Sequence, residues 1–259
     1  MNNTTASYPD PIATAPSPGP VSLRLPSSPP RVTYTLLAIT IGMYLLQMLS
    51  QMALGYDLPI ALGAKSNELI RAGELWRLIT PVLLHGSILH IGFNMYALFS
   101  FGVGLERRFG HGRFLLLYLL AGFAGNVLSF LITRDPSVGS STSVFGLVAA
   151  EGVFLYQNRK LFGAETKHAI NNVISVVVIN LLIGFSSGGY IDNWGHIGGL
   201  LGGLVFTWFS GPLWEVEGVY PLLRLVDSRA GGREVVLGAA VVLLIFGALA
   251  IVGLVWPLV

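Results

Sequence analysis

The chain has 259 residues, of which 53% are hydrophobic and only 11% are charged, whereas an ordinary soluble domain carries about 25% charged residues. So few charges cannot cover a soluble surface of this size, and the 15 basic and 13 acidic side chains are too evenly balanced to indicate a nucleic-acid-binding protein. The sequence contains no cysteine, which excludes disulfides, a thiolate nucleophile and cysteine-ligated metal sites.

The first 31 residues are rich in proline, serine and threonine. They lack the basic start and the apolar core of a signal peptide, and also the basic amphipathic character of a transit peptide. We therefore expect residues 1–31 to form a disordered cytoplasmic tail.

Seven apolar segments follow, each close to the 20 or so residues that a helix needs to cross a hydrocarbon layer of about 30 Å. Only the fourth contains a formal charge, Glu151, which we interpret as reaching the membrane interface or pairing with an arginine such as Arg159, in preference to a catalytic role. The chain is therefore predicted to be an all-α polytopic membrane protein with spans at 32–54, 78–104, 114–133, 140–157, 169–188, 193–213 and 236–259.

Basic residues in the connections predict the orientation of these spans, because cytoplasmic loops accumulate lysine and arginine. The tail and the even-numbered connections carry eleven of the 15 basic residues, and the opposite side carries four. The N-terminus is therefore predicted to be cytoplasmic and the C-terminus outside, so that the second, fourth and sixth spans begin at the outer face.

Three of the five histidines, His85, His90 and His196, lie in the outer parts of these even-numbered spans. Ionisable side chains at membrane depth are candidates for function. Ser141 also lies at this depth, in the first turn of the fourth span, where free backbone N–H groups and the helix dipole favour developing negative charge. Taken alone, a serine in this position is more often a helix cap than a nucleophile.

His196 makes Ser141 a stronger candidate, because it lies about four residues into the sixth span, which begins at the same outer face. Gly199 and Gly203 follow His196 at i+3 and i+7, and Gly152 follows Ser141 at i+11, so both helices have small residues that permit close packing. A serine-to-imidazole hydrogen bond requires such an approach. The alternative is glycine-mediated packing around a satisfied, buried histidine.

In the second span, His90 and Asn94 share a helix face through their i, i+4 spacing, and together with the N–H of Ser141 they would form an oxyanion hole. The alternative is a polar clamp between helices. On an ideal helix His85 points about 140° away from His90, and we assign it a structural role in binding a loop or water. Asp192, at i−4 from His196, is interpreted as a helix cap in preference to the third member of a triad.

These residues resemble the rhomboid family from Trp76 to Gly203, because four motifs occur in the same order. They are Trp76-Arg77 in the first connection, His85 with His90 and Asn94, the serine motif from Gly139 to Leu147, and the segment from Asp192 to Gly203 that holds the histidine and the glycines. Thr142 departs from the commonest form of the serine motif, which has glycine there, so a threonine side chain is expected to affect substrate access or oxyanion geometry.

The resemblance implies an intramembrane serine endopeptidase with Ser141 as nucleophile, His196 as general base, and His90 and Asn94 as oxyanion donors. It also implies supporting roles for Gly139, Gly199, Gly203, Trp76, Arg77 and His85, and for Phe145, which falls where the family has an aromatic residue that packs against the histidine. Residues 32–213 would form a six-helix catalytic domain, 214–235 a cytoplasmic connection, and 236–259 one additional C-terminal helix. No cofactor and no metal are expected.

The expected partners are the lipid bilayer and single-span or polytopic membrane-protein substrates, cleaved near the outer end of a transmembrane segment, in the plasma (inner) membrane of a prokaryote. One alternative is a noncatalytic rhomboid-like protein that binds membrane clients. Another is a transporter that uses the histidines as proton relays. A metalloprotease is disfavoured, because the sequence has no His-Glu-x-x-His pair.

Overall fold

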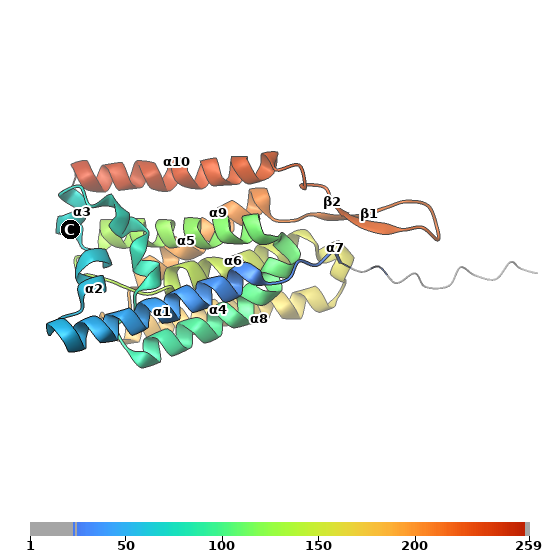
Figure 1. Cartoon of the computed structure of the whole chain (residues 1–259). Helices are drawn as coiled ribbons and strands as arrows, with labels where there is room; N and C mark the ends of the chain where they lie inside the picture. The colour runs from blue at the N-terminus through green and yellow to red at the C-terminus, as the bar shows by residue number, and fades with distance from the viewer. Residues whose placement is uncertain (1–22, 24, 257–259) are drawn as a thin grey trace, which may run out of the picture.

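The structure is a computed structural model that describes residue 23 and residues 25–256. The predicted tail, residues 1–31, therefore lies mostly outside the described residues. The described part is dominated by seven long helices that run back and forth along one axis (Figure 1): α1 (Arg31–Leu54), α4 (Ile88–Phe109), α5 (His111–Ile132), α6 (Ser141–Gln157), α8 (Glu165–Ser186), α9 (Asn193–Ser210) and α10 (Arg233–Val255).

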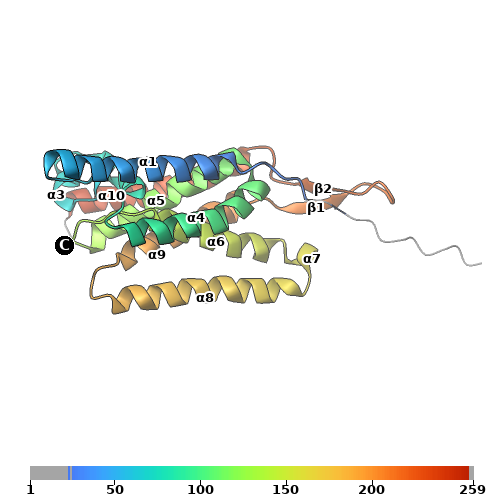
Figure 2. The ribbon, with the colours of Figure 1, turned by 60° about the horizontal axis from the view of Figure 1, so that its bottom comes forward.

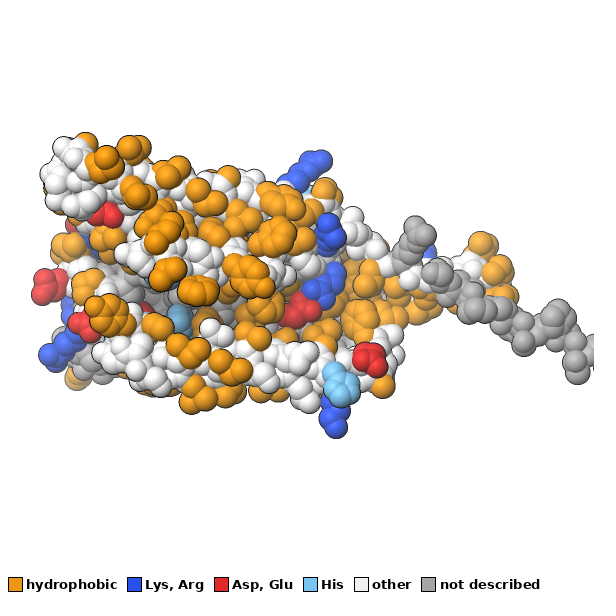
Figure 3. Space-filling view, turned by 90° about the horizontal axis from the view of Figure 1, so that it is seen from below, with side chains coloured by type: hydrophobic (Ala, Val, Ile, Leu, Met, Phe, Trp, Pro, Cys, Tyr) orange, Lys and Arg blue, Asp and Glu red, His pale blue; other side chains and the backbone are white. Residues whose placement is uncertain are grey.

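The predicted polytopic membrane character agrees with this arrangement. Five of the described helices, α1, α4, α5, α8 and α10, are long and apolar enough to cross a membrane. The other two, α6 and α9, have 17 and 18 residues. One face of the molecule shows a broad apolar band, with most of the charged side chains gathered toward its two ends (Figure 3).

Helices α5, α6 and α9 pack closely on one another and form the centre of the bundle. Around them, α10 packs on α5 and α9, α4 packs on α6 and α1, and α8 packs mainly on α6. In Figure 2, α8 runs along one edge of the bundle. We call the end at which α6 and α9 begin the Ser141 end, and the opposite end the hairpin end (Figure 1).

The second predicted span, 78–104, was wrong at its start by ten residues. The chain from Leu75 to Leu83 instead forms two short 3₁₀ helices, η1 (Leu75–Leu78) and η2 (Thr80–Leu83), and α4 begins only after Ser87, whose side chain accepts a hydrogen bond from the His90 N–H at 3.2 Å. Pro81 lies in η2, where its missing N–H and fixed φ are compatible with a short helix but not with the interior of a long one.

The first connection folds back onto the Ser141 end through α2 (Leu58–Gly63) and α3 (Asn67–Arg71). Lys65 pairs by its backbone with Ser137, and its buried ammonium donates to the carbonyl oxygens of Thr133 and Asp135 at 2.7 and 2.8 Å. Burial lowers the pKa of Lys65 to about 8. This lysine therefore ties the first connection to the segment that leads into α6.

The connection 214–235 contains a β-hairpin that the all-α prediction did not include. Strands β1 (Trp214–Glu217) and β2 (Arg224–Asp227) pair antiparallel and project beyond the helices (Figures 1 and 2). Arg113, at the start of α5, anchors the hairpin through Asp227, with 2.5 Å between Nη1 and Oδ2. A short helix, α7 (Arg159–Phe162), lies at the same end.

Two carboxylates on these helices have partners that sequence reasoning did not find. Glu151 pairs with an arginine, as predicted, but this arginine is Arg108 of α4 and not Arg159. The second span also carries a charge, because α4 extends to Phe109 and includes the fully buried Glu106. The carboxylate of Glu106 accepts from both N–H and hydroxyl of Thr33, at 2.7 and 2.6 Å, and so caps the start of α1.

Candidate active site

A serine and a histidine meet at the Ser141 end, between the first turns of α6 and α9. The Oγ of Ser141 lies 2.9 Å from Nε2 of His196, and the imidazole is 7% exposed. Ser141 is the first residue of α6, where backbone N–H groups have no partner within the helix. The arrangement therefore combines a hydroxyl, a base and a helix N-terminus in one place.

Glycines permit this contact, because they let α9 approach α6 closely. A Cβ at Gly199 would overlap the carbonyl oxygen of Thr142, and a Cβ at Gly203 would overlap the backbone of Gly146. Gly152, in contrast, faces α8, since a Cβ there would meet Val173 at 3.3 Å. The expectation of close packing thus fits Gly199 and Gly203, whereas Gly152 was wrongly assigned to this face.

Gly139 shapes the chain just before Ser141. Its φ of +133° is a conformation that side chains disfavour, and a Cβ there would lie 2.7 Å from Nε2 of His90. Its N–H donates to the carbonyl of Pro81 at 2.9 Å, which joins the segment to η2. Only glycine therefore lets the imidazole of His90 lie against this turn, next to Ser141.

Asn94 lies one turn below His90 on α4 and is buried. Its Nδ2 donates to the carbonyl oxygen of His90 at 3.1 Å. In this conformation the amide is bonded within its own helix. The structure thus places His90 beside Ser141 and holds Asn94 in the next turn.

His85 does not lie on α4, so the helical-wheel angle predicted between His85 and His90 was wrong. It precedes the helix, is 1% exposed, and its Nε2 lies 3.3 Å from Oγ of Ser140. Its backbone N–H and C=O both bond the amide side chain of Gln47 on α1. His85 thus links α1 to the residue that precedes Ser141.

The imidazole of His196 is held by stacking and not by a carboxylate. The ring of Phe145 is parallel to it within 11°, with 4.3 Å between the centroids. Nδ1 of His196 has no hydrogen-bond partner among the described residues. Asp192 instead caps α9, accepting from the Gly195 N–H at 2.9 Å and from the hydroxyl of Ser129.

Thr142 points away from Ser141 and into the helix interface. A Cβ added at Gly125 of α5 would meet the Thr142 side chain, and one added at Gly195 of α9 would do the same. Thr142 is 5% exposed. Its side chain is therefore a packing element between α5 and α9, and the expected effect of Thr142 on substrate access or oxyanion geometry stays a prediction.

Trp76 and Arg77 lie outside the site and brace the first connection. Arg77 is 3% exposed and donates to the carbonyl oxygens of Ala64 and Ala61 at 2.8 and 2.7 Å. The indole N–H of Trp76 donates to the carbonyl of Leu62 at 3.0 Å. Both side chains therefore hold α2, whose last carbonyl groups they bond.

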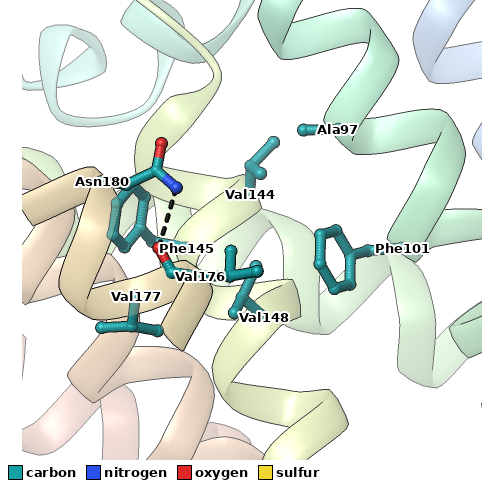
Figure 4. A pocket seen from close by; sticks show the side chains of 8 residues that line it. All are labelled: Ala97, Phe101, Val144, Phe145, Val148, Val176, Val177 and Asn180. Carbon is teal, nitrogen blue, oxygen red and sulfur yellow. Dashed lines mark hydrogen bonds between the residues drawn. The ribbon is translucent and has the colours of Figure 1, made fainter. Parts of the chain in front are cut away.

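A small cavity of about 70 Å³ lies beside the stacked pair, between α4, α6 and α8. Apolar side chains line it together with one amide, Asn180, whose Nδ2 donates to the carbonyl of Val176 at 2.8 Å (Figure 4). Phe145 both lines the cavity and stacks on His196. Phe145 therefore lies between His196 and the cavity.

Sequence reasoning missed three polar residues that support the site, namely Gln47 on α1, Ser129 on α5, and Ser140 directly before α6. Each bonds a residue discussed above: Gln47 and Ser140 bond His85, and Ser129 bonds Asp192. A usable signal was present, because Gln47 and Ser129 are polar side chains inside otherwise apolar helices.

Comparison with known proteins identifies similar sequences. Residues 72–212, more than half of the chain, match the family model described as "Rhomboid domain". The chain is 43% identical over 174 residues to rhomboid protease GluP of Bacillus subtilis, and the matched segment covers 67% of this chain and 34% of that protein. It is 38% identical over 161 residues to the chloroplastic RHOMBOID-like protein 9 of Arabidopsis thaliana, covering 62% of this chain and 37% of that protein. Rhomboid-like protease 1 of Toxoplasma gondii is 35% identical over 153 residues, covering 57% of this chain and 51% of that protein.

The chain thus spans about a third to a half of the length of these relatives. Because they include a plant organellar protein, the comparison does not support a prokaryotic origin, and the prokaryotic plasma membrane stays a prediction from the sequence.

Proposed function

The chain belongs to the rhomboid family, and from this premise we propose that it is an intramembrane serine endopeptidase that uses Ser141 and His196 as a dyad. The observation that carries the proposal is the distance of 2.9 Å between the serine Oγ and the imidazole Nε2 at the first turn of α6. A hydroxyl that donates to an imidazole is the pairing that activates serine as a nucleophile.

The reaction begins when Oγ of Ser141 attacks the carbonyl carbon of the scissile peptide bond and its proton passes to Nε2 of His196. The negative charge then develops on the carbonyl oxygen, next to the backbone N–H groups at the start of α6 and the imidazole of His90. Asn94 would join these donors by rotating its amide away from the carbonyl of His90. Breakdown of the tetrahedral intermediate returns the proton to the leaving amine and leaves an acyl-enzyme, which water hydrolyses through the same base.

Phe145 and the glycines position this machinery. The parallel ring of Phe145 fixes the plane of the imidazole, a role that a carboxylate plays in a triad. Gly199 and Gly203 bring the two helices close enough for the serine and histidine to meet.

We also propose that α6 and α9 cross the membrane with the five longer helices, giving a six-helix domain and one additional helix, α10. The hairpin end, which carries most of the basic residues, would be cytoplasmic. The dyad would then lie near the outer face, and substrates would be transmembrane segments cleaved near their outer ends.

Labelling with a fluorophosphonate tests the nucleophile directly. The full chain in detergent is expected to react at Ser141, to lose labelling in Ser141→Ala, and to lose most of it in His196→Ala, because the alcohol then has no base. Peptide mapping by mass spectrometry locates the adduct. An unlabelled wild-type chain would favour a noncatalytic client-binding protein, and labelling elsewhere would contradict the assignment of Ser141.

The Asp192→Asn substitution separates a dyad from a triad. We expect turnover to stay within about threefold of wild type, because asparagine keeps the oxygen that accepts from the Gly195 N–H. Asp192→Ala is expected to lower stability by about 1 kcal/mol through loss of the cap. Turnover and melting temperature measured on both variants distinguish a dyad from a triad. Loss of turnover in Asp192→Asn with unchanged melting would assign the carboxylate a catalytic role.

A further inference from the structure

A second cavity, of about 280 Å³, lies at the Ser141 end between α3 and the segment that follows α5. Its lining residues are Asn67, Glu68, Arg71 and Arg134. None of them belongs to the serine and histidine site. The lining carries two guanidinium groups and one carboxylate, so it presents charges of both signs within one small space.

The two arginines differ in how firmly they are held. The Nε of Arg71 donates to the carbonyl oxygen of Gly253 on α10 at 3.4 Å, and its guanidinium lies over the ring of Phe130, 5.3 Å from the centroid. Arg134 is exposed and forms no ion pair within the described part of the chain. Guanidinium groups of this kind suit a phosphate, which they bind through several N–H donors.

Asn67 favours a hydrogen-bond donor on the ligand, whereas the two arginines favour an acceptor. It is 6% exposed, and its Nδ2 donates to the carbonyl oxygens of Phe130 and Thr133 at 3.2 and 3.1 Å, which fixes the orientation of the amide. Its Oδ1 is buried and has no hydrogen-bond partner among the described residues. A buried acceptor without a partner is unfavourable, so this oxygen favours a ligand that brings a donor. Glu68, exposed beside it, adds a negative charge.

The depth of the cavity in the membrane follows from α10. Trp256 directly follows the last residue of this helix and is 72% exposed, three residues after the carbonyl that Arg71 binds. Exposed tryptophans at the ends of spanning helices mark the level of lipid headgroups. The cavity is therefore at the height of the phosphates of one leaflet.

We infer that this cavity binds a phosphoethanolamine group, with its phosphate on Arg71 and Arg134 and its ammonium on Glu68 and Oδ1 of Asn67. The lipid that carries this group is phosphatidylethanolamine. Its primary ammonium has three N–H donors, whereas the quaternary nitrogen of phosphatidylcholine has none and leaves Oδ1 of Asn67 without a partner. The difference in binding affinity between the two lipids therefore measures the contribution of Asn67 and Glu68.

The test uses the full chain in detergent, titrated with dihexanoyl phosphatidylethanolamine and dihexanoyl phosphatidylcholine and followed by calorimetry. We expect at least about tenfold tighter binding of the ethanolamine lipid, the size of effect that one or two charge-assisted hydrogen bonds give. Glu68→Gln should remove most of this preference, and Arg134→Gln should weaken binding of both lipids. Both side chains are exposed, so the variants are expected to keep the wild-type melting temperature.

Matched controls come from the exposed ion pair between Glu217 and Arg224 on the hairpin, where the same Glu→Gln and Arg→Gln changes should alter neither affinity. Soluble phosphoethanolamine serves as a separate probe: binding as tight as that of the lipid identifies the headgroup alone as the ligand, and weaker binding assigns the difference to the acyl chains. Equal affinity of the wild-type chain for the two lipids would overturn the inference, and so would a preference that persists in Glu68→Gln. These measurements do not depend on proteolysis, so failure here leaves the proposed function intact.

Discussion

Replacing Ser141 with alanine is expected to lower cleavage of a transmembrane substrate by at least about 10³-fold, because removal of the nucleophile leaves only binding and oxyanion contacts. The melting temperature should stay near that of wild type, since the hydroxyl bonds only His196 in the described structure. The measurement is the initial rate of cleavage of single-span substrates by purified protein in detergent or liposomes.

His196→Ala is expected to cause a loss of similar size, and the double variant should lose no more than either single one, because the two side chains act as a unit. Ser100→Ala provides the control: this exposed serine of α4 donates to the carbonyl of Tyr96 at 2.8 Å, far along the helix from His90. Cleavage that persisted at more than a tenth of the wild-type rate in Ser141→Ala would disprove the serine mechanism. It would favour a transport or client-binding role.

Replacing Gly199 with valine is expected to destabilise the protein by more than about 3 kcal/mol and to abolish activity. The new Cβ would overlap the carbonyl oxygen of Thr142, which is backbone at the start of α6 and has no rotamer to change. Helix α9 would have to move away from α6, and the serine and histidine would separate. Thermal unfolding and fluorophosphonate labelling measure the two consequences.

Gly247→Val is the matched control, because Gly247 lies on α10 and a Cβ there meets nothing within 4 Å. It should leave melting and labelling close to wild type. Gly199→Ala adds a smaller side chain at the same place, and its melting temperature and labelling should lie between those of the two valine variants. A Gly199→Val protein with wild-type stability and labelling would show that close contact between α6 and α9 does not hold the site together.

Much of the site was predictable from the sequence because helical periodicity and topology act together. Spans of alternating direction bring every second helix start to one end, so topology alone predicted that Ser141 and His196 lie at one depth. The i+3 and i+7 spacing of Gly199 and Gly203 from His196 indicated the face through which α9 approaches α6, and the structure has the close contact there.

Errors arose where the chain between helices has its own structure. The apolar run from Leu78 to Leu84 reads as part of a span, but Pro81 interrupts it, and α4 begins only at Ile88, so His85 precedes α4. Hydropathy does not distinguish a short 3₁₀ segment buried in protein from a helix buried in lipid, because both exclude water. Glu151 was similarly given the wrong arginine, because pairing between α4 and α6 depends on their rotation about their own axes.

The sequence by itself determined that the chain is a polytopic membrane protein of the rhomboid family, because the spacing of apolar segments and the order of four motifs are properties of the chain alone. Tertiary structure decided which way side chains face: Thr142 turns into the packing against α5 and α9, and Asp192 caps α9 and leaves Nδ1 of His196 without a partner among the described residues. It also created the cavity around Asn67, whose residues are separated in the sequence by the whole of α4 and α5. Such contacts depend on the rotation and separation of packed helices, and these are fixed only when glycines and buried polar groups from several segments meet.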